Sequence, residues 1–235
     1  MPTVNFSVFE AVSDRITAAC DRSGRHPNEI TIVGVTKGHP AEVLSKARAL
    51  GLTDIGESKV QEAYRKYELT VIEGQSLSFR FHMIGQLQSN KVKRAVQVFN
   101  CIDTIDSYDT VVSVDKQCAE VGKRMRVLVQ VNTSDEAQKS GVAPEGAKLL
   151  GEQILGLQNI DFQGFMTMGP LEGTERTIRK SFMQLRELRD QMCQELKIQE
   201  LPVLSMGMSG DFEWAIEEGA TEVRLGTVLW GAREQ

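Results

Sequence analysis

VLSMGMSGDFEWAIEEGATEVRL, residues 203–225, contains two β-rich runs separated by a helical stretch. The runs are Val203–Met206 and Glu222–Leu225, and the helix between them begins near Asp211. Two strands joined through a helix lie parallel in one sheet, because the helix carries the chain back along the face of the sheet in a right-handed crossover. This stretch therefore predicts a parallel α/β sheet.

The same alternation of β-rich runs and helical stretches extends back toward the N-terminus. The eight runs are Ile30–Thr36, Asp54–Gly56, Phe79–Ile84, Cys101–Thr104, Arg126–Asn132, Asp161–Thr167, Val203–Met206 and Glu222–Leu225. Eight strand–helix units in a chain of 235 residues are the number that closes a (β/α)8 TIM barrel, an α/β fold. A doubly wound open sheet is the alternative, and the absence of a Gly-x-Gly-x-x-Gly pattern after the first run argues against it.

An extra helix is predicted before the first strand, from Ser7 to Arg22. Ser7 and Glu10 have the spacing of a capping box, and Gly24 is a typical helix stop. The chain contains no proline-rich linker, charge block or low-complexity tract, so we expect residues 1–235 to form one domain.

Composition excludes several classes of protein. The chain has 27 Lys and Arg against 32 Asp and Glu, a formal net charge of -5, which disfavours nucleic-acid binding. Its apolar stretches are too short to cross a bilayer, and its N-terminus lacks the basic and apolar regions of a secretion signal. The four cysteines form no Cys-x-x-Cys pair, so we expect reduced thiols, no metal site and a cytoplasmic location.

Lys37 is the first candidate for chemistry, because it follows the first strand in phase with Val33 and Val35. Catalytic groups of TIM barrels lie where the strands end, so this lysine is expected at the barrel mouth. Desolvation there lowers the pKa of an amine and makes it a nucleophile suited to Schiff-base formation. The alternative is a lysine whose ammonium group extends into solvent.

A phosphate site is predicted where the seventh and eighth strands end. Ser205, Met206, Gly207 and Ser209 belong to or follow the seventh strand, and Gly226 and Thr227 follow the eighth. The loops after these two strands are the usual phosphate-binding place of TIM barrels. Taken singly, each cluster is also compatible with an ordinary glycine turn.

Three further residues are candidates for the barrel interior or its mouth. Arg224 alternates with outward-facing apolar neighbours, so it either bonds a ligand ring nitrogen or forms an ion pair with Glu222 or Glu57. His82 is a candidate acid, base or stacking group, although a histidine in a strand is commonly structural. Lys139 follows the fifth strand and is most simply a solvated loop residue.

Several segments resemble one known family, the pyridoxal phosphate homeostasis proteins, which are single-domain barrels similar to the N-terminal domain of alanine racemase. The matching segments are VGVTKGHP at 33–40, DIGESKVQEA at 54–63, FHMIGQLQSNK at 81–91, VNTSDEAQKSG at 131–141, GFMTMGP at 164–170 and LSMGMSGDFEWAIEEGATEVRLGTVLWGAR at 204–233. Ser58 stands where the family usually has asparagine, and Trp230 where it usually has phenylalanine.

The resemblance implies that pyridoxal 5'-phosphate (PLP) is the cofactor and that Lys37 forms an internal aldimine with it. Ser205, Ser209, Gly226 and Thr227 would bind the phosphate, and Arg224 would face the pyridine nitrogen. The full expected cofactor-binding set is Lys37, Ser58, His82, Ser205, Met206, Gly207, Ser209, Arg224, Gly226 and Thr227.

The resemblance implies a non-catalytic carrier that buffers PLP for vitamin B6 and amino-acid homeostasis and makes transient contacts with PLP-dependent apoenzymes. An arginine at the ring nitrogen leaves that nitrogen unprotonated, which weakens carbanion stabilisation. Alanine racemase takes a tyrosine from its second domain as the second base, and this chain ends at Gln235 without room for that domain. The tyrosines of this chain, Tyr64, Tyr67 and Tyr108, lie in helical segments with no obvious route into the barrel mouth. A weak PLP-dependent racemase, with His82 or water as the second base, and a cofactor-free Schiff-base aldolase are the alternatives. We expect a monomer, because no heptad or large apolar stripe indicates a partner.

Overall fold

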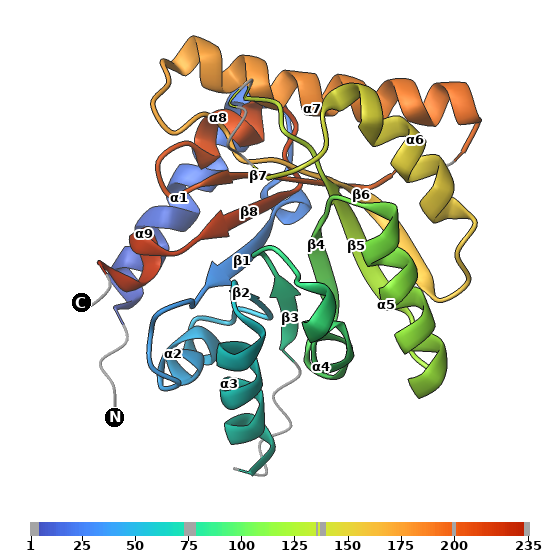
Figure 1. The fold of residues 1–235 in the computed structure, drawn as a ribbon. Helices are drawn as coiled ribbons and strands as arrows, with labels where there is room; N and C mark the ends of the chain where they lie inside the picture. The colour runs from blue at the N-terminus through green and yellow to red at the C-terminus, as the bar shows by residue number, and fades with distance from the viewer. Residues whose placement is uncertain (1–4, 73–78, 135, 137–139, 199–200, 233–235) are drawn as a thin grey trace.

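The computed structural model describes residues 5–72, 79–134, 136, 140–198 and 201–232. Eight parallel strands form a closed barrel in the order of the sequence, from β1 to β8 (Figure 1). The strands are β1 Thr31–Val35, β2 Asp54–Glu57, β3 Arg80–Met83, β4 Cys101–Ile105, β5 Met125–Gln130, β6 Ile160–Met166, β7 Val203–Met208 and β8 Glu222–Leu225. The predicted TIM barrel is confirmed, and the open doubly wound sheet is wrong, because β1 pairs with β8.

Helices surround the barrel and cover the outer face of its strands. They are α1 Phe6–Ser23, α2 Val43–Ala49, α3 Val60–Ile72, α4 Val92–Val98, α5 Tyr108–Val121, α6 Pro144–Leu155, α7 Glu175–Leu196, α8 Phe212–Glu217 and α9 Thr227–Trp230, with short 3₁₀ helices at Pro27–Glu29 and Ser89–Lys91. No helix in the described ranges combines the length and the apolar character needed to cross a membrane.

The predicted N-terminal helix exists, but its start differs from the prediction. Asn5 caps α1 by accepting a hydrogen bond from the Val8 backbone N–H at 3.4 Å, and Ser7 donates to the Asn5 side chain at 2.8 Å. The Ser7–Glu10 capping box is therefore wrong, because Ser7 lies inside the helix. The predicted stop is correct, since Gly24 adopts a left-handed conformation with φ 67°.

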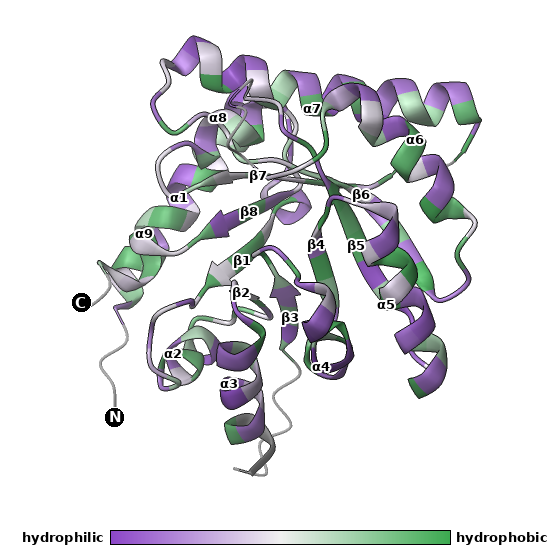
Figure 2. Cartoon of the chain, in the orientation of Figure 1, coloured by the Kyte–Doolittle hydropathy of each residue, from purple (hydrophilic) through white to green (hydrophobic). Residues whose placement is uncertain are grey.

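The main apolar core lies between the barrel and its helices. Val223 and Leu225 of β8 are fully buried and face this layer, while Arg224 between them faces the barrel interior. Figure 2 shows mostly hydrophobic residues along β4 and β5 and long hydrophilic stretches on α7. Helix α1 packs beside α8, where Arg15 and Glu213 form an ion pair at 2.6 Å.

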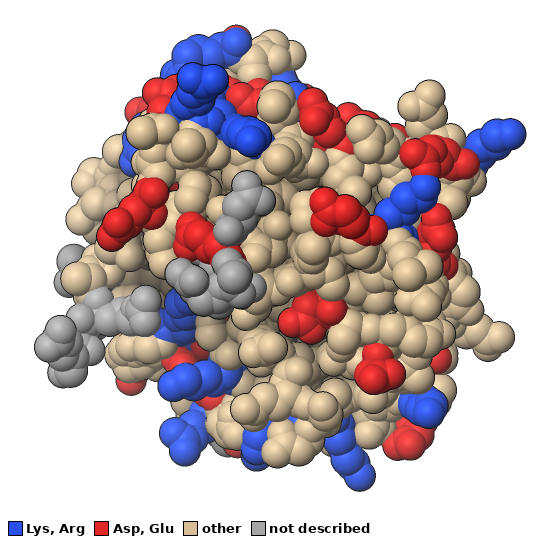
Figure 3. Space-filling model, turned by 45° about the horizontal axis from the view of Figure 1, so that its top comes forward, with Lys and Arg blue, Asp and Glu red and all other residues tan. Residues whose placement is uncertain are grey.

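Charged side chains of both signs are interspersed on the face of the molecule shown in Figure 3, with broad uncharged areas between them. The four cysteines carry free thiols, and three of them are buried.

Candidate functional site

A cavity of about 250 Å³ lies at the carboxyl ends of the strands, where the loops after β1, β6, β7 and β8 meet. Five of the ten predicted site residues line it: Lys37, Ser209, Arg224, Gly226 and Thr227. Val35, His39, Ile84, Met168, Met208 and Gly210 complete the lining. The cavity thus combines apolar walls with an amine, a guanidinium group and hydroxyl groups.

Lys37 reaches this cavity from the turn that follows β1. Val33 is buried inside the barrel, and Val35 and Lys37 both line the cavity, so the predicted inward phase of these residues is correct. Gly38 has φ 74°, a left-handed conformation that glycine adopts without the steric cost a Cβ would carry. The lysine side chain is half-buried, which allows a ligand in the cavity to reach its amine.

Arg224 forms the wall at β8 and is held by hydrogen bonds to oxygen atoms. Its Nη1 donates to the Ser205 carbonyl and hydroxyl oxygens, both at 2.8 Å, and its Nη2 donates to the Thr167 carbonyl at 2.7 Å. The predicted alternative of an ion pair with Glu222 or Glu57 is wrong, because these carboxylates bond Arg126 and Lys66. Burial lowers the pKa of Arg224 from its ordinary value. Within the described ranges, Nε of Arg224 forms no hydrogen bond.

The loops after β7 and β8 lie against each other at the cavity. Ser209 Oγ accepts a hydrogen bond from the Val228 backbone N–H at 3.3 Å, which joins the two loops. Asp211 accepts from the Met208 N–H at 2.5 Å and closes the turn between β7 and α8, while burial raises the pKa of this carboxyl. The hydroxyl groups of Ser209 and Thr227 therefore border one end of the cavity.

Three predicted phosphate-site residues lie deeper in β7 than the sequence suggested. Strand β7 continues to Met208, two residues beyond the predicted end, so the loop begins only at Ser209. Ser205 is buried beneath Arg224, and Met206 belongs to the apolar core outside the barrel. Gly207 has φ 93°, and a Cβ there would approach the Ala215 side chain to 2.6 Å, so it permits close strand–helix packing.

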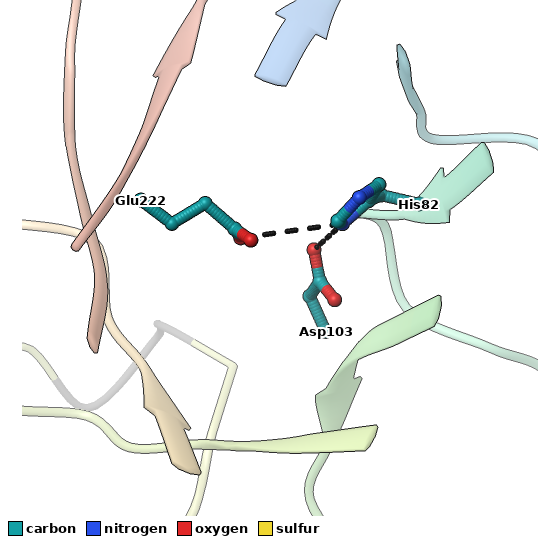
Figure 4. Close-up of side chains that lie close together, drawn as sticks. All are labelled: His82, Asp103 and Glu222. Carbon is teal, nitrogen blue, oxygen red and sulfur yellow. Dashed lines mark hydrogen bonds and ion pairs between the residues drawn. The ribbon is translucent and has the colours of Figure 1, made fainter. Parts of the chain in front are cut away.

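His82 is fully buried inside the barrel and does not line the cavity. Its Nδ1 contacts Asp103 Oδ2 and its Nε2 contacts Asp54 Oδ1, each at 2.9 Å, and Glu222 Oε1 lies 4.0 Å from Nδ1. Figure 4 shows Glu222 of β8 and Asp103 of β4 pointing toward His82 of β3. Burial alone would lower the pKa of His82, but the surrounding carboxylates outweigh it and raise the pKa well above its ordinary value of 6.5. This arrangement is a buried ionic cluster that connects strands.

One other predicted site residue, Ser58, also does not line the cavity. Ser58 follows β2 and packs against Gly85, where an added Cβ would lie 2.4 Å from the Ser58 carbonyl oxygen. Lys139 lies outside the described residues. Sequence reasoning did not identify Ile84 and Met168 as lining residues, although each follows the end of a strand, the position that places side chains at a barrel mouth.

Comparison with known proteins identifies a family for the whole chain. The model of the alanine racemase N-terminal domain matches residues 10–234. A pyridoxal phosphate homeostasis protein of Aquifex aeolicus is 41% identical over 223 residues, which cover 95% of this chain and 96% of the relative. A protein of the same name from Pseudomonas aeruginosa is 37% identical and covers 95% and 93%.

Solved structures support the same grouping. PipY of Synechococcus elongatus, solved with PLP bound, superposes with a TM-score of 0.82 at 30% identity, covering 94% of this chain and all of PipY. An alanine racemase of Clostridium difficile has a TM-score of 0.75 at 15% identity, covering 94% of this chain and 58% of the racemase. The racemase likeness shows a shared fold.

Proposed function

This chain belongs to the family of pyridoxal phosphate homeostasis proteins, and from that premise we propose that it is a non-catalytic PLP carrier. The proposed site is the cavity at the carboxyl ends of the strands, with Lys37 as the point of covalent attachment. The observation that carries the proposal is that one cavity brings together Lys37, Arg224 and the hydroxyl groups of Ser209 and Thr227.

The lining suits the parts of PLP one by one. Val35, Ile84, Met168 and Met208 offer apolar contacts for the pyridine ring. Arg224, whose Nη1 and Nη2 are bound to Ser205 and Thr167, would hold the ring nitrogen through a hydrogen bond from Nε. Ser209, Gly226 and Thr227 offer hydroxyl and backbone N–H donors to the phosphate. Ser205, Met206 and Gly207 support this end from within β7.

Attachment through Lys37 is reversible, as a carrier requires. Lys37 would hold PLP through its amine, since an amine and an aldehyde condense reversibly with loss of water, and hydrolysis would return the free lysine and the free cofactor. We propose that the protein is a cytoplasmic monomer that releases PLP to apoenzymes during transient contacts. This supply of PLP would contribute to vitamin B6 and amino-acid homeostasis.

Two features favour a carrier over an enzyme. Arg224 donates hydrogen bonds and accepts none, so it would leave the ring nitrogen of bound PLP unprotonated and make the cofactor a poor electron sink. His82, the second base expected for a racemase, has both ring nitrogens bonded to carboxylates inside the barrel. A weak racemase remains the alternative because His39 lines the cavity and could act as the second base.

Titration with PLP and an exchange assay test these claims. The wild-type protein should develop a near-visible absorbance band with PLP, and Lys37→Ala should lose it. Lys93→Ala, which removes an exposed lysine of α4, should keep the band. Loaded protein incubated with amino acids in deuterated water should show no α-proton exchange above the rate of free PLP. Exchange that depends on Lys37 and His39 would instead establish the racemase.

A further inference from the structure

The backbone on both sides of Lys37 is held by side chains of α3. Lys66 Nζ donates a hydrogen bond to the Thr36 carbonyl oxygen at 2.7 Å. The Gly38 backbone N–H donates to Glu62 Oε1 at 2.6 Å. Lys37 therefore lies between two peptide groups that are both bonded to one helix.

These α3 side chains are also bonded to each other and to β2. Lys66 Nζ donates to Glu57 Oε1 at 2.6 Å and to Glu62 Oε1 at 2.9 Å. Glu57 Oε1 accepts a further hydrogen bond from the Thr36 hydroxyl at 2.6 Å. Glu57, Glu62 and Lys66, hereafter the Lys66 clamp, thus connect β2, α3 and the turn after β1.

Most of the clamp is removed from water. Lys66 is 3% exposed and Glu57 is fully buried, while Glu62 is partly exposed. Burial raises the pKa of Glu57, and its contacts with Lys66 only partly oppose this. A buried ion pair costs desolvation energy, and packed apolar residues often stabilise a core equally well, so fold stability alone does not account for this pair.

The position of Lys37 explains what the clamp does. Lys37 lies two residues beyond the end of β1, where the sheet no longer fixes the chain. A lysine has a long side chain, and each freely rotating segment adds conformational entropy that must be lost when a bond forms. Fixing the two adjacent peptide groups removes the backbone part of that loss before the ligand arrives.

We propose that Glu57, Glu62 and Lys66 are positioning residues that hold the Lys37 turn so that its amine faces the cavity. The inference rests on the proposed attachment of PLP to Lys37. Helix α3 then affects PLP affinity without contacting PLP, because its side chains act only on the backbone of the turn.

The test uses one pair of single variants and one double variant. Glu62→Ala removes the acceptor of the Gly38 N–H at a partly exposed position, so the fold should survive. Glu62→Gln keeps an oxygen acceptor and should retain binding. Glu57→Gln/Lys66→Met removes both buried charges together, so the only carboxylate that loses its partner is Glu62, which is partly exposed.

Each variant is titrated with PLP while the near-visible band and the rate of its appearance are recorded from pH 6 to pH 9. Glu62→Ala and the double variant should bind PLP about tenfold more weakly, the change expected from losing one hydrogen bond to a charged group. Their pH profiles of band formation should shift relative to the wild type, whereas Glu62→Gln should stay within about twofold.

Lys123→Met is the matched control for a general loss of stability. Like Lys66, Lys123 donates to backbone carbonyl oxygens, those of Val96 and Phe99 at the end of α4, and it is partly buried. The Lys123→Met variant should have a lower melting temperature than the wild type and bind PLP with wild-type affinity. The proposal is overturned if Glu62→Ala and the double variant match the wild type, or if Lys123→Met loses as much affinity at an equal loss of melting temperature. Failure of the wild type to form the band would overturn the attachment site itself.

Discussion

His82→Gln tests the assignment of the buried histidine to stability. The substitution removes the positive charge from between Asp54 and Asp103 while it keeps a polar side chain of similar length. Asp54 retains its ion pair with Arg80 at 2.8 Å, so Asp103 is the carboxylate that loses its charged partner. Breaking a buried ion pair costs about 3–5 kcal/mol, and glutamine recovers part of one hydrogen bond.

We therefore expect His82→Gln to lower the free energy of unfolding by about 3 kcal/mol, which corresponds to roughly 10 °C in melting temperature for a chain of this size. The pKa of His82 is raised in the folded protein, so its contribution is complete below the ordinary value of 6.5 and declines as the pH rises above it. The gap in melting temperature between wild type and variant should be widest at pH 6 and narrow toward pH 9.

Thermal unfolding followed by circular dichroism at several pH values measures this gap. His26→Gln, at an exposed histidine, is the control and should show no comparable gap. The folded His82→Gln protein should bind PLP with wild-type affinity. A melting temperature within about 2 °C of wild type, or a selective loss of PLP binding by the folded variant, would refute the structural role of His82.

Two other substitutions give expected outcomes. Gly164→Ala should lower the free energy of unfolding by more than about 3 kcal/mol in chemical denaturation, because Gly164 has φ 144° and an added Cβ would lie 2.0 Å from the Val203 carbonyl oxygen. The control is Gly146→Ala in α6, where no atom lies within 4 Å of the added Cβ, and it should be neutral or slightly stabilising. Equal unfolding free energies of the two variants would show that the expected clash at Gly164 is wrong. Arg224→Lys should weaken PLP binding at least tenfold in equilibrium dialysis, because lysine lacks the planar group that bonds Ser205 and Thr167 together, and unchanged affinity would exclude Arg224 from the site.

The barrel could be predicted from the sequence because each strand–helix unit has its own local pattern. The β-rich run and the following apolar helical spacing are visible within about 30 residues. The start of α1 could not be predicted in the same way. Asn5 and Ser7 are both good caps, and only the hydrogen bond from Val8 to Asn5 decides between them.

Within the site, the phase of each strand was visible but the depth along the barrel was not. Alternation correctly placed Arg224 and Lys37 on the inner face. The same alternation also directs His82 and Ser205 inward, yet they lie below the cavity, because the pairing register of neighbouring strands sets the height of each residue. The contacts of the Lys66 clamp could not be predicted from the sequence, since they join residues of different elements that only the closed fold brings together.

Borohydride reduction of the PLP-loaded protein determines whether PLP is attached to Lys37. Reduction converts the C=N bond to a stable C–N bond, so peptide mass mapping can locate the pyridoxyl group. We expect a label on the peptide that contains Lys37 and loss of this label in Lys37→Ala. A label found on other lysines with Lys37 unmodified, or no label in a protein that retains PLP, would contradict it.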